Sequence, residues 1–511
     1  MHPISRRRFL AQASIAAAAT ALPQAAFATK ELPLAGRLAA DPLRPQYHLL
    51  PAANWMNDPN GPIFYQGRYH MFFQYNPNGA YWGDMHWAHA TSPDMIRWAH
   101  DPVAIFPTPN GWDRYGVFSG SVVLDGTTPT AIYTGVLPPD SPQGITLDDG
   151  NHQWREVQCL ATSADPHLRT WQKLANPIIA RPPEGPSVTG FRDPGVWREG
   201  NDWLLTLGSG IKGTGGMVLI YKSADLRTWE YLHPLIAGAG TGHPAANPCD
   251  NGEMWECPDF FPLGDRHVLI YATMGKVLWK TGTYKDHHFT SDKEGVVDGG
   301  SYYAAKSMLD ASNTRILWGW LPEARPEAEY KAAGWAGLMS LPRVLTIGSD
   351  GSLEMKVAPV AETLRGKNTP VRPGLASQKQ RALQALRIHA LAAEIEAEFM
   401  PGQGFQLKLI SERKQRFAEI AYDPLQKGKE LSVNAVRTPL DAAEPISLQL
   451  FLDGSSLEVI ANRKAAITAR IYTIPQGPLK VEVAHLDGLR QLQAWEMTPI
   501  SQDRLAGTLR T

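Results

Sequence analysis

The sequence predicts an all-β protein, a five-bladed β-propeller followed by a C-terminal β-sandwich. Three observations predict this fold. A turn that ends in tryptophan recurs along the N-terminal part, short apolar strands recur beside it, and alternating strands return after a polar junction. The chain has 511 residues, which allows two globular domains, since one hydrophobic core seldom grows past about 250–300 residues.

The composition narrows the class of protein. Lys and Arg number 49 and Asp and Glu number 50, so the formal net charge is −1. A protein that binds nucleic acid through phosphates should carry a basic excess, so we expect no nucleic-acid partner. With 45 Gly, 41 Pro, 16 Trp and 16 Tyr, the chain suits a carbohydrate-handling β protein. We expect Cys159, Cys249 and Cys257 to be free thiols or small core residues.

Residues 1–28 predict an export signal of the twin-arginine type. Consecutive arginines in residues 5–10 precede an Ala-rich stretch and the small-x-small site at residues 26–28. The alternative is an ordinary basic N-terminus followed by a helix. Residues 11–25 contain Gln and Ser and are too weakly apolar for a permanent anchor. We therefore expect a mature protein without a membrane anchor, periplasmic or secreted.

The clearest internal repeat is a Ser/Asp turn that ends in tryptophan. It spans residues 92–98, 163–171 and 223–229, and each copy is followed by Pro and then Ile or Leu. Such spacing predicts one hairpin in each repeated unit. We expect the three repeat tryptophans, Trp98, Trp171 and Trp229, to pack within the blades rather than to bind sugar.

A second series of apolar or aromatic strands agrees with this repeat. These strands start near Arg68, Thr130, Trp203, Arg266 and Arg315. Five such units fit a five-bladed propeller better than a sandwich, and they place it at residues 47–345. Residues 346–380 are polar, contain Pro and Gly, and predict a linker. Alternating strands over residues 381–511 then predict the β-sandwich.

Three carboxylates share one register relative to the repeated strands. Asp58, Asp193 and Glu256 each lie ten residues before a strand start. Taken singly, Asp58 could be an ordinary turn residue, because its neighbours favour a turn, and Asp193 could belong to a surface ion pair with Arg192. Equivalent positions in the blades of a propeller are related by rotation about its axis. The shared register therefore predicts that the three acids converge in one central funnel, with residues 118–121 and 301–304 in corresponding places.

Converging carboxylates suit the chemistry of a glycosidic bond, in which one attacks the anomeric carbon and another protonates the leaving oxygen. We expect Asp58 to stay ionised as the nucleophile. Burial and a neighbouring negative charge are expected to raise the pKa of Glu256, the acid. Asp193, beside Arg192 in the sequence, is expected to remain charged and to stabilise an oxocarbenium ion. No cofactor or metal is expected, since His86, His89, His287 and His288 lie in different repeats.

The segments Trp55–Gly61, Phe191–Pro194 and Trp255–Phe261 are similar to three motifs of glycoside hydrolase family 32, the invertases, inulinases and levanases. Further similar segments are residues 74–77, 82–89, 118–121, 334–337 and 453–459. The resemblance covers the propeller and the sandwich.

The resemblance implies a retaining mechanism with a covalent fructosyl-enzyme on Asp58. Glu256 would be the acid/base and Asp193 the transition-state stabiliser, with the carboxyls of Asp58 and Glu256 about 5–5.5 Å apart. Cys257 would tune the acid. The implied substrate-binding residues are Asn57, Gln74, Trp82, Phe118, Ser121, Arg192, Asp298 and Trp335.

The resemblance implies sucrose or fructan oligosaccharides as the substrates. The nearest similarity is to plant cell-wall invertases and fructan exohydrolases. In that group, an Asp followed three residues later by Lys favours the glucosyl part of sucrose, whereas here Asp298 is followed by Ser301. Sucrose, inulin and levan therefore all stay open, as does fructosyl transfer to a sugar hydroxyl. A sugar-binding propeller without catalysis is the alternative from another class, and the presence of all three acids argues against it.

Overall fold

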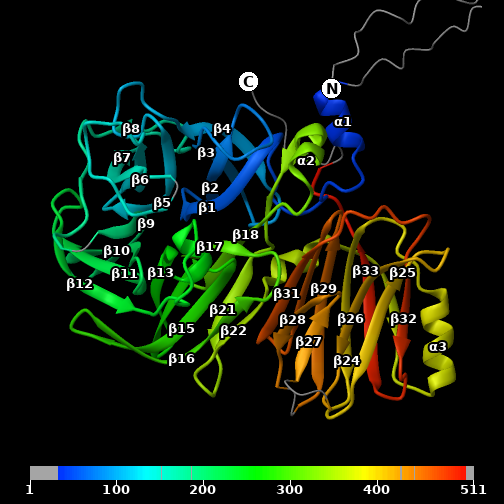
Figure 1. Cartoon of the computed structure of the whole chain (residues 1–511). Helices are drawn as coiled ribbons and strands as arrows, with labels where there is room; N and C mark the ends of the chain where they lie inside the picture. Colours follow the sequence, from blue (N-terminus) through cyan, green and yellow to red (C-terminus); the bar gives the residue numbers. More distant parts are fainter. Residues whose placement is uncertain (1–32, 151, 186, 426–428, 442–443, 502–511) are drawn as a thin grey trace, which may run out of the picture.

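The computed structural model describes residues 33–150, 152–185, 187–425, 429–441 and 444–501. The predicted export signal, residues 1–28, lies outside the described residues. Figure 1 shows two bodies side by side, one formed by the blue to green strands and the other by the yellow to red strands. The predicted all-β fold, a five-bladed propeller followed by a sandwich, is confirmed.

Five sheets form the propeller, and each is a blade with antiparallel neighbours. The first three blades are β1 (Asn54–Tyr65), β2 (Arg68–Asn76), β3 (His86–Ser92) and β4 (Ala99–Ile105); β5 (Gly116–Asp125), β6 (Thr128–Leu137), β7 (Arg155–Thr162) and β8 (Gln172–Lys173); and β9 (Val188–Glu199), β10 (Asp202–Ile211), β11 (Gly215–Ser223) and β12 (Glu230–Ala237). The last two are β13 (Glu256–Leu263), β14 (Arg266–Thr273), β15 (Lys276–Lys285) and β16 (His288–Asp298); and β17 (Tyr303–Leu309), β18 (Arg315–Leu321), β21 (Arg343–Ile347) and β22 (Leu353–Val357), with β20 (Leu338–Met339) beside β18.

The first strand of each blade lies next to the propeller axis. β1, β5, β9, β13 and β17 contact one another in sequence around a ring. A short strand from late in the propeller, β19 (Trp335–Ala336), pairs in parallel with β1 of this ring. It directly follows helix α2 (Glu327–Ala333). Residues on these five inner strands can therefore face one central cavity.

The tryptophan repeat forms the same turn three times. In each copy a Ser and an Asp hydrogen-bond across the turn, and the tryptophan Nε1 donates to the carbonyl oxygen three residues earlier, at Met95, Leu168 and Leu226. Those three residues also share a positive φ. The prediction that Trp98, Trp171 and Trp229 pack within the blades is confirmed, because each contacts an apolar cluster.

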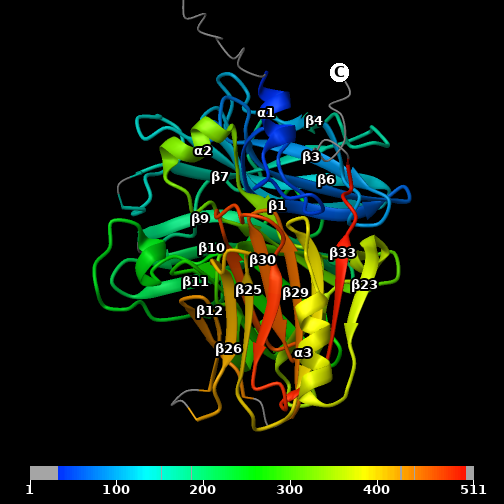
Figure 2. The same cartoon turned by 90° about the vertical axis from the view of Figure 1, so that its right-hand side faces the viewer.

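The C-terminal domain is a sandwich of two antiparallel sheets around one apolar core. One sheet contains β23 (Arg365–Val371), β33 (Leu489–Met497), β24 (Ala392–Phe399), β29 (Ile446–Asp453), β30 (Ser456–Ala461) and β31 (Ala465–Arg470). The other contains β28 (Val436–Pro439), β27 (Glu430–Val433), β26 (Arg416–Tyr422), β25 (Phe405–Ile410) and β32 (Lys480–Ala484). Helix α3 (Ala376–Ala385) contacts β32 and β23 and lies along the edge of the sandwich (Figure 2).

Residues 346–380, for which the sequence predicts a linker, are mostly ordered structure that belongs to both domains. The fifth blade extends to Val357 through β22, whose residues alternate between buried and half-buried. The short helix η2 (Pro359–Leu364) then leads directly into β23, an edge strand of the sandwich. The polar composition of this segment reflects edge strands with one exposed face, which composition alone does not distinguish from a linker.

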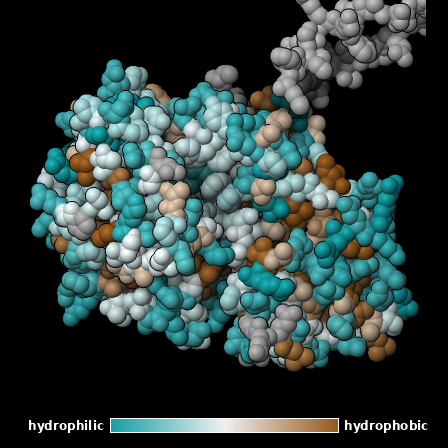
Figure 3. Space-filling model, viewed as in Figure 1, coloured by the Kyte–Doolittle hydropathy of each residue, from teal (hydrophilic) through white to brown (hydrophobic). Residues whose placement is uncertain are grey.

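The two domains share a continuous interface. An apolar cluster joins propeller residues to Ala392, Phe451, Ile460, Ala466 and Met497 of the sandwich. A fully buried charged cluster beside it contains His48, Asp298, Arg343, Asp453 and Glu458, which we call the interdomain cluster. The face shown in Figure 3 is mainly hydrophilic, with apolar residues in small groups.

Candidate active site

All five inner strands carry a register shift at the same level of the propeller. The shifts lie between Met56 and Pro59, Val117 and Gly120, Arg192 and Gly195, Glu256 and Asp259, and Tyr303 and Lys306. Three residues within these bulges, Asp193, Cys257 and Ala304, have positive φ. A bulge re-aims the side chains of a strand, and bulges are common next to active sites. The shared register in the sequence is thus a shared bulge in the structure.

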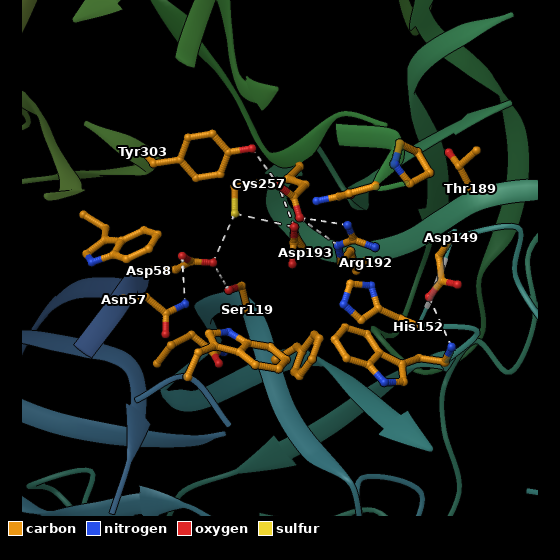
Figure 4. Close-up of a pocket in the computed structure, with 18 residues that line it drawn as sticks. Asn57, Asp58, Ser119, Asp149, His152, Thr189, Arg192, Asp193, Cys257 and Tyr303 are labelled. Carbon is orange, nitrogen blue, oxygen red and sulfur yellow. Dashed lines mark hydrogen bonds and ion pairs between the residues drawn. The ribbon is translucent and has the colours of Figure 1, made fainter. Parts of the chain in front are cut away.

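The bulges surround one pocket, a cavity of about 290 Å³. Eight of the predicted site residues line it: Asn57, Asp58, Gln74, Trp82, Phe118, Arg192, Asp193 and Glu256. Figure 4 shows the carboxylates of Asp58 and Asp193 turned toward the same space. The structure therefore brings the three predicted acids together.

The Asp58 carboxylate is held from both sides. Ser119 Oγ donates to Oδ2 at 2.7 Å, and Asn57 Nδ2 donates to Oδ1 at 3.0 Å. Trp55 Nε1 in turn donates to Asn57 Oδ1 at 2.7 Å, which fixes the orientation of that amide. Burial nevertheless raises the pKa of Asp58, because the hydrogen bonds do not offset the loss of water and the negative charge of Glu256 adds to the rise. The polar surroundings expected from the sequence are present, but they do not lower this pKa.

Asp193 lies at the centre of the group and contacts Cys257. The backbone nitrogen of Cys257 donates to Asp193 Oδ2 at 2.9 Å, and Cys257 Sγ lies 3.5 Å from that oxygen and 3.6 Å from Asp58 Oδ2. Burial raises the pKa of Asp193 to about 7, and the charges of Glu256 and Asp58 add to the shift. The expectation that Arg192 keeps Asp193 charged is wrong, because the guanidinium makes its hydrogen bonds elsewhere.

Glu256 is the carboxylate that Arg192 holds. Arg192 Nη2 and Nε donate to Glu256 Oε1 at 2.8 and 3.2 Å, and Tyr303 OH donates to Oε2 at 2.7 Å. Although burial alone raises the pKa of Glu256, the charge and hydrogen bonds of Arg192 and the bond from Tyr303 outweigh it, so the pKa is lowered. The expected raised pKa of the acid is therefore wrong for the free protein.

A further buried carboxylate, Glu156 of β7, holds the other side of Arg192. Glu156 Oε1 accepts from Arg192 Nη1 at 3.0 Å, and Glu156 Oε2 accepts from the backbone nitrogen of Phe191 at 2.6 Å. Its side chain is fully buried. Arg192 therefore lies between two carboxylates, only one of which faces the pocket.

Three predicted substrate-binding residues do not line the pocket. Ser121 lies two residues beyond the β5 bulge and donates to the carbonyl oxygen of Pro194 at 2.5 Å. Trp335 is fully buried in β19, where its Nε1 donates to Asp41 and the Arg325 guanidinium lies over its ring. Asp298 belongs to the interdomain cluster, where Arg343 and Thr468 donate to it. The argument from Asp298 about the glucosyl part of sucrose therefore does not apply.

Other lining residues were not singled out from the sequence. They are Ser119, Asp149, His152, Trp154, Thr189, Asn247, Pro248, Tyr303 and Trp320. Ser119 and Tyr303 fall in the two segments predicted to correspond to the acids, so their positions in the repeat could have identified them. Asp149, His152 and Trp154 lie on the connection between β6 and β7, which no repeat predicts.

Within the described part of the chain, no three His, Cys, Asp or Glu side chains are placed to hold a metal ion. The three cysteines are buried and free, as predicted. No helix among the described residues is long and apolar enough to cross a bilayer.

A propeller funnel with clustered carboxylates, one of them bound by an arginine and a tyrosine, suits the chemistry of a glycoside hydrolase. The comparison with family models makes the class specific. Residues 48–357 match the N-terminal domain of glycosyl hydrolases family 32 and residues 361–496 match its C-terminal domain. The chain belongs to glycoside hydrolase family 32.

Relatives and solved structures agree with this assignment. The sucrose-6-phosphate hydrolase of Escherichia coli is 35% identical over 467 residues, 84% of this chain and 90% of that protein. A mutant Bombyx mori β-fructofuranosidase in complex with sucrose superposes with a TM-score of 0.75 at 26% identity, over 91% of this chain and 96% of that one. A mutant fructan 1-exohydrolase IIa from Cichorium intybus in complex with 1-kestose gives a TM-score of 0.69 at 27% identity, over 90% and 98%.

Proposed function

We propose that this protein is a retaining, exo-acting β-fructofuranosidase that hydrolyses sucrose and terminal β-D-fructosyl residues. The observation that carries the proposal is the convergence of Asp58, Asp193 and Glu256 at three equivalent bulges around one pocket. The similarity to proteins solved with sucrose and with 1-kestose supports this class of substrate.

The reaction proceeds in two steps. Asp58 attacks the anomeric carbon of the fructosyl unit while Glu256 gives its proton to the leaving oxygen, so a carbon–oxygen bond to the enzyme forms as the glycosidic bond breaks. Glu256 then takes a proton from water, whose oxygen bonds to the same carbon and releases Asp58. Asp193 lies beside both groups, where its charge stabilises the oxocarbenium-like transition state.

The proton must reach Glu256 before it can be donated. In the free enzyme the pKa of Asp193 is raised and that of Glu256 is lowered, so a shared proton favours Asp193. Hydroxyl groups of a bound sugar compete for the donors of Arg192, which weakens the hold of the guanidinium on Glu256. Activity should be bell-shaped in pH, since one carboxyl must be ionised and another protonated.

The size of the pocket supports the exo mode. A cavity of about 290 Å³ is at the small end of the range for ligand sites. It suits one or two sugar rings at the end of a chain rather than a long internal segment.

The test is to incubate the protein with sucrose, inulin and levan and to quantify free glucose and fructose over time. Equal release of glucose and fructose from sucrose, and fructose alone from the ends of fructans, is the expected result. Release of oligosaccharides from the middle of fructans would contradict the exo mode. A fructan exohydrolase releases fructose only from the polymers, and a fructosyltransferase produces longer chains at high sucrose, so the same assay separates both alternatives.

We also propose that residues 1–28 direct export to the periplasm or medium through a twin-arginine-type route. The proposal rests on the consecutive arginines, the Ala-rich stretch and the small-x-small site in the sequence. Expression of the full chain in a bacterium, with N-terminal sequencing of the exported protein, tests it. Cleavage after Ala28 and retention in the cytoplasm when Arg6 and Arg7 are both changed to Lys are expected. Normal export of the double variant would contradict the route.

A further inference from the structure

The pocket has an aromatic wall that the three acids do not explain. The rings of Trp82 and Trp154 are stacked with centroids 5.5 Å apart and an interplanar angle of 19°. His152 stacks on Trp154 with centroids 4.2 Å apart, and Phe118 meets Trp154 edge-on at 5.3 Å. All four side chains line the pocket, and 46% of Trp82 is exposed. These stacked rings, which are partly exposed to the pocket, form a flat apolar surface.

A buried carboxylate fixes this wall in place. Asp149 is only 4% exposed and accepts hydrogen bonds from the backbone nitrogens of Gln153, at 2.5 Å, and Trp154, at 3.1 Å. The backbone that carries Trp154 is thus tied at two successive amides, so the ring does not depend on stacking alone for its position. In Figure 4, Asp149 lies beyond Arg192 on the side of the pocket opposite Asn57 and Asp58, and His152 lies beside Arg192.

That position places the wall on the leaving-group side of the reacting bond. Asp58 attacks from one end of the pocket, and Glu256, held by Arg192, protonates the oxygen of the group that departs. The group that departs must therefore extend past Glu256 and Arg192, toward His152 and the stacked tryptophans. Sugar rings present C–H faces that pack on aromatic rings, so such a wall fits a sugar in the leaving group.

The charges that line the pocket restrict which sugar fits. Among the described lining residues, four are carboxylic acids, Asp58, Asp149, Asp193 and Glu256, and Arg192 is the only Lys or Arg. Both sides of Arg192 are already occupied, by Glu256 and by Glu156. A phosphate on the leaving sugar would therefore enter a negative field in which no described Lys or Arg of the pocket lining is free to pair with it.

We infer that the stacked wall of Trp82, Trp154 and His152 is the subsite for the leaving group and selects an uncharged sugar ring over a phosphorylated one. The inference rests on the proposed fructosidase function. It separates this protein from the E. coli relative that is named as a sucrose-6-phosphate hydrolase. The leaving ring is the glucose of sucrose or the next fructose of a fructan, and both share the uncharged face.

The first experiment changes the wall. Trp154→Ala should lower kcat/KM for sucrose about 10-fold, mainly through a higher KM, and Trp154→Phe should recover much of the loss. Inhibition by free fructose, which needs only the fructosyl subsite, should change less than about twofold in both variants. Phe106→Ala is the matched control, because Phe106 is 59% exposed and does not line the pocket. Parallel assays with 1-kestose and levan show whether a fructose leaving group uses the same wall.

The second experiment compares sucrose with sucrose 6-phosphate, whose phosphate is on the glucose. The unmodified protein should prefer sucrose by about 100-fold or more in kcat/KM, and Asn247→Lys should reduce that preference by placing a cation in the pocket lining. Equal rates on both substrates, or an unchanged KM for sucrose in Trp154→Ala, would overturn the inference. If the unmodified protein does not act on sucrose or any fructan, the proposed function fails instead, so the two failures are distinguishable.

Discussion

Two buried clusters in this protein each contain three carboxylic acids, yet their physical states are opposite. In the pocket, Asp58, Asp193 and Glu256 lie near one guanidinium, that of Arg192, which pairs with Glu256 and with Glu156 outside the pocket. In the interdomain cluster, Asp298, Asp453 and Glu458 share two cationic groups, Arg343 and His48, with side chains that are fully buried. The difference in charge compensation separates a reactive cluster from a structural one.

Hydrogen bonds widen this difference. Asp453 accepts from three successive backbone nitrogens, those of residues 46–48, and from His48 Nδ1 at 2.7 Å. Glu458 accepts from His48, Arg343 and the backbone of Leu341, and its pKa falls to about 2. Asp193, with a single backbone donor from Cys257, has a pKa raised to about 7 instead. Glu458, which has many donors, therefore stays ionised near neutral pH, whereas Asp193 can gain and lose a proton there.

The largest expected effect is the loss of turnover when an acid of the reactive cluster is replaced. Asp58→Asn should lower kcat by about 10⁴-fold or more, because it removes the nucleophile, and Glu256→Gln by about 10²–10⁴-fold. Burial raises the pKa of Asp58, so its charge costs stability near neutral pH, and Asp58→Asn should leave the thermal midpoint unchanged or higher. Steady-state kinetics and thermal unfolding check both statements. Near-normal turnover in either variant would show that its carboxyl has no part in the chemistry.

The next largest effect is the loss of stability when a cation of the interdomain cluster is replaced. Arg343→Met should lower the free energy of unfolding by about 3–5 kcal/mol, because it leaves Asp298 and Glu458 buried without their guanidinium. Turnover at low temperature should stay close to normal, since Arg343 does not line the pocket. Lys464→Met is the control, because the Lys464–Asp350 ion pair is about half exposed and should contribute less than about 1 kcal/mol. Equal denaturation midpoints for the two variants would contradict this account of the interface.

The pH dependence of stability sharpens the same comparison. Asp453 and Glu458 raise the pKa of buried His48 from 6.5 to about 9 against the opposing effect of burial. The folded state binds the His48 proton more tightly than the unfolded chain does. This contribution is therefore fully present below pH 6.5 and is lost as the pH rises through about 9. Denaturation midpoints should fall over that window in the unmodified protein, and the His48 contribution should be missing in His48→Gln.

The smallest effect concerns Glu156. Glu156→Gln removes a negative charge beside Arg192, which favours the ionised forms of the pocket carboxyls. The bell-shaped profile of kcat/KM should move to lower pH by about 0.5–1 unit, with the height of its maximum changed less than the position. Exposed Glu327→Gln on α2 is the control. An unmoved profile would show that Glu156 only packs against the strand.

The fold and the three acids could be predicted from the sequence because both recur at regular positions along the chain. The Ser/Asp–Trp turn and the ten-residue offset of the acids follow from blades that share one backbone geometry. Asp298 illustrates the limit, because a carboxylate beside a predicted site segment turns instead to Arg343, far away in the sequence. The pKa directions of Glu256 and Asp193 were missed for a similar reason, since the partner of Arg192 is Glu256 and not its neighbour in the sequence. The aromatic wall lies on an irregular connection that no periodicity describes.

The most direct test of the central claim is to trap the fructosyl-enzyme. Glu256→Gln reacted with an aryl β-fructofuranoside, whose leaving group needs no proton, should accumulate the intermediate because water then lacks its base. Rapid quenching and peptide mass spectrometry should place one fructosyl unit on Asp58. A fructosyl unit on any other residue, or rapid release of fructose with inverted configuration and no adduct, would contradict the account.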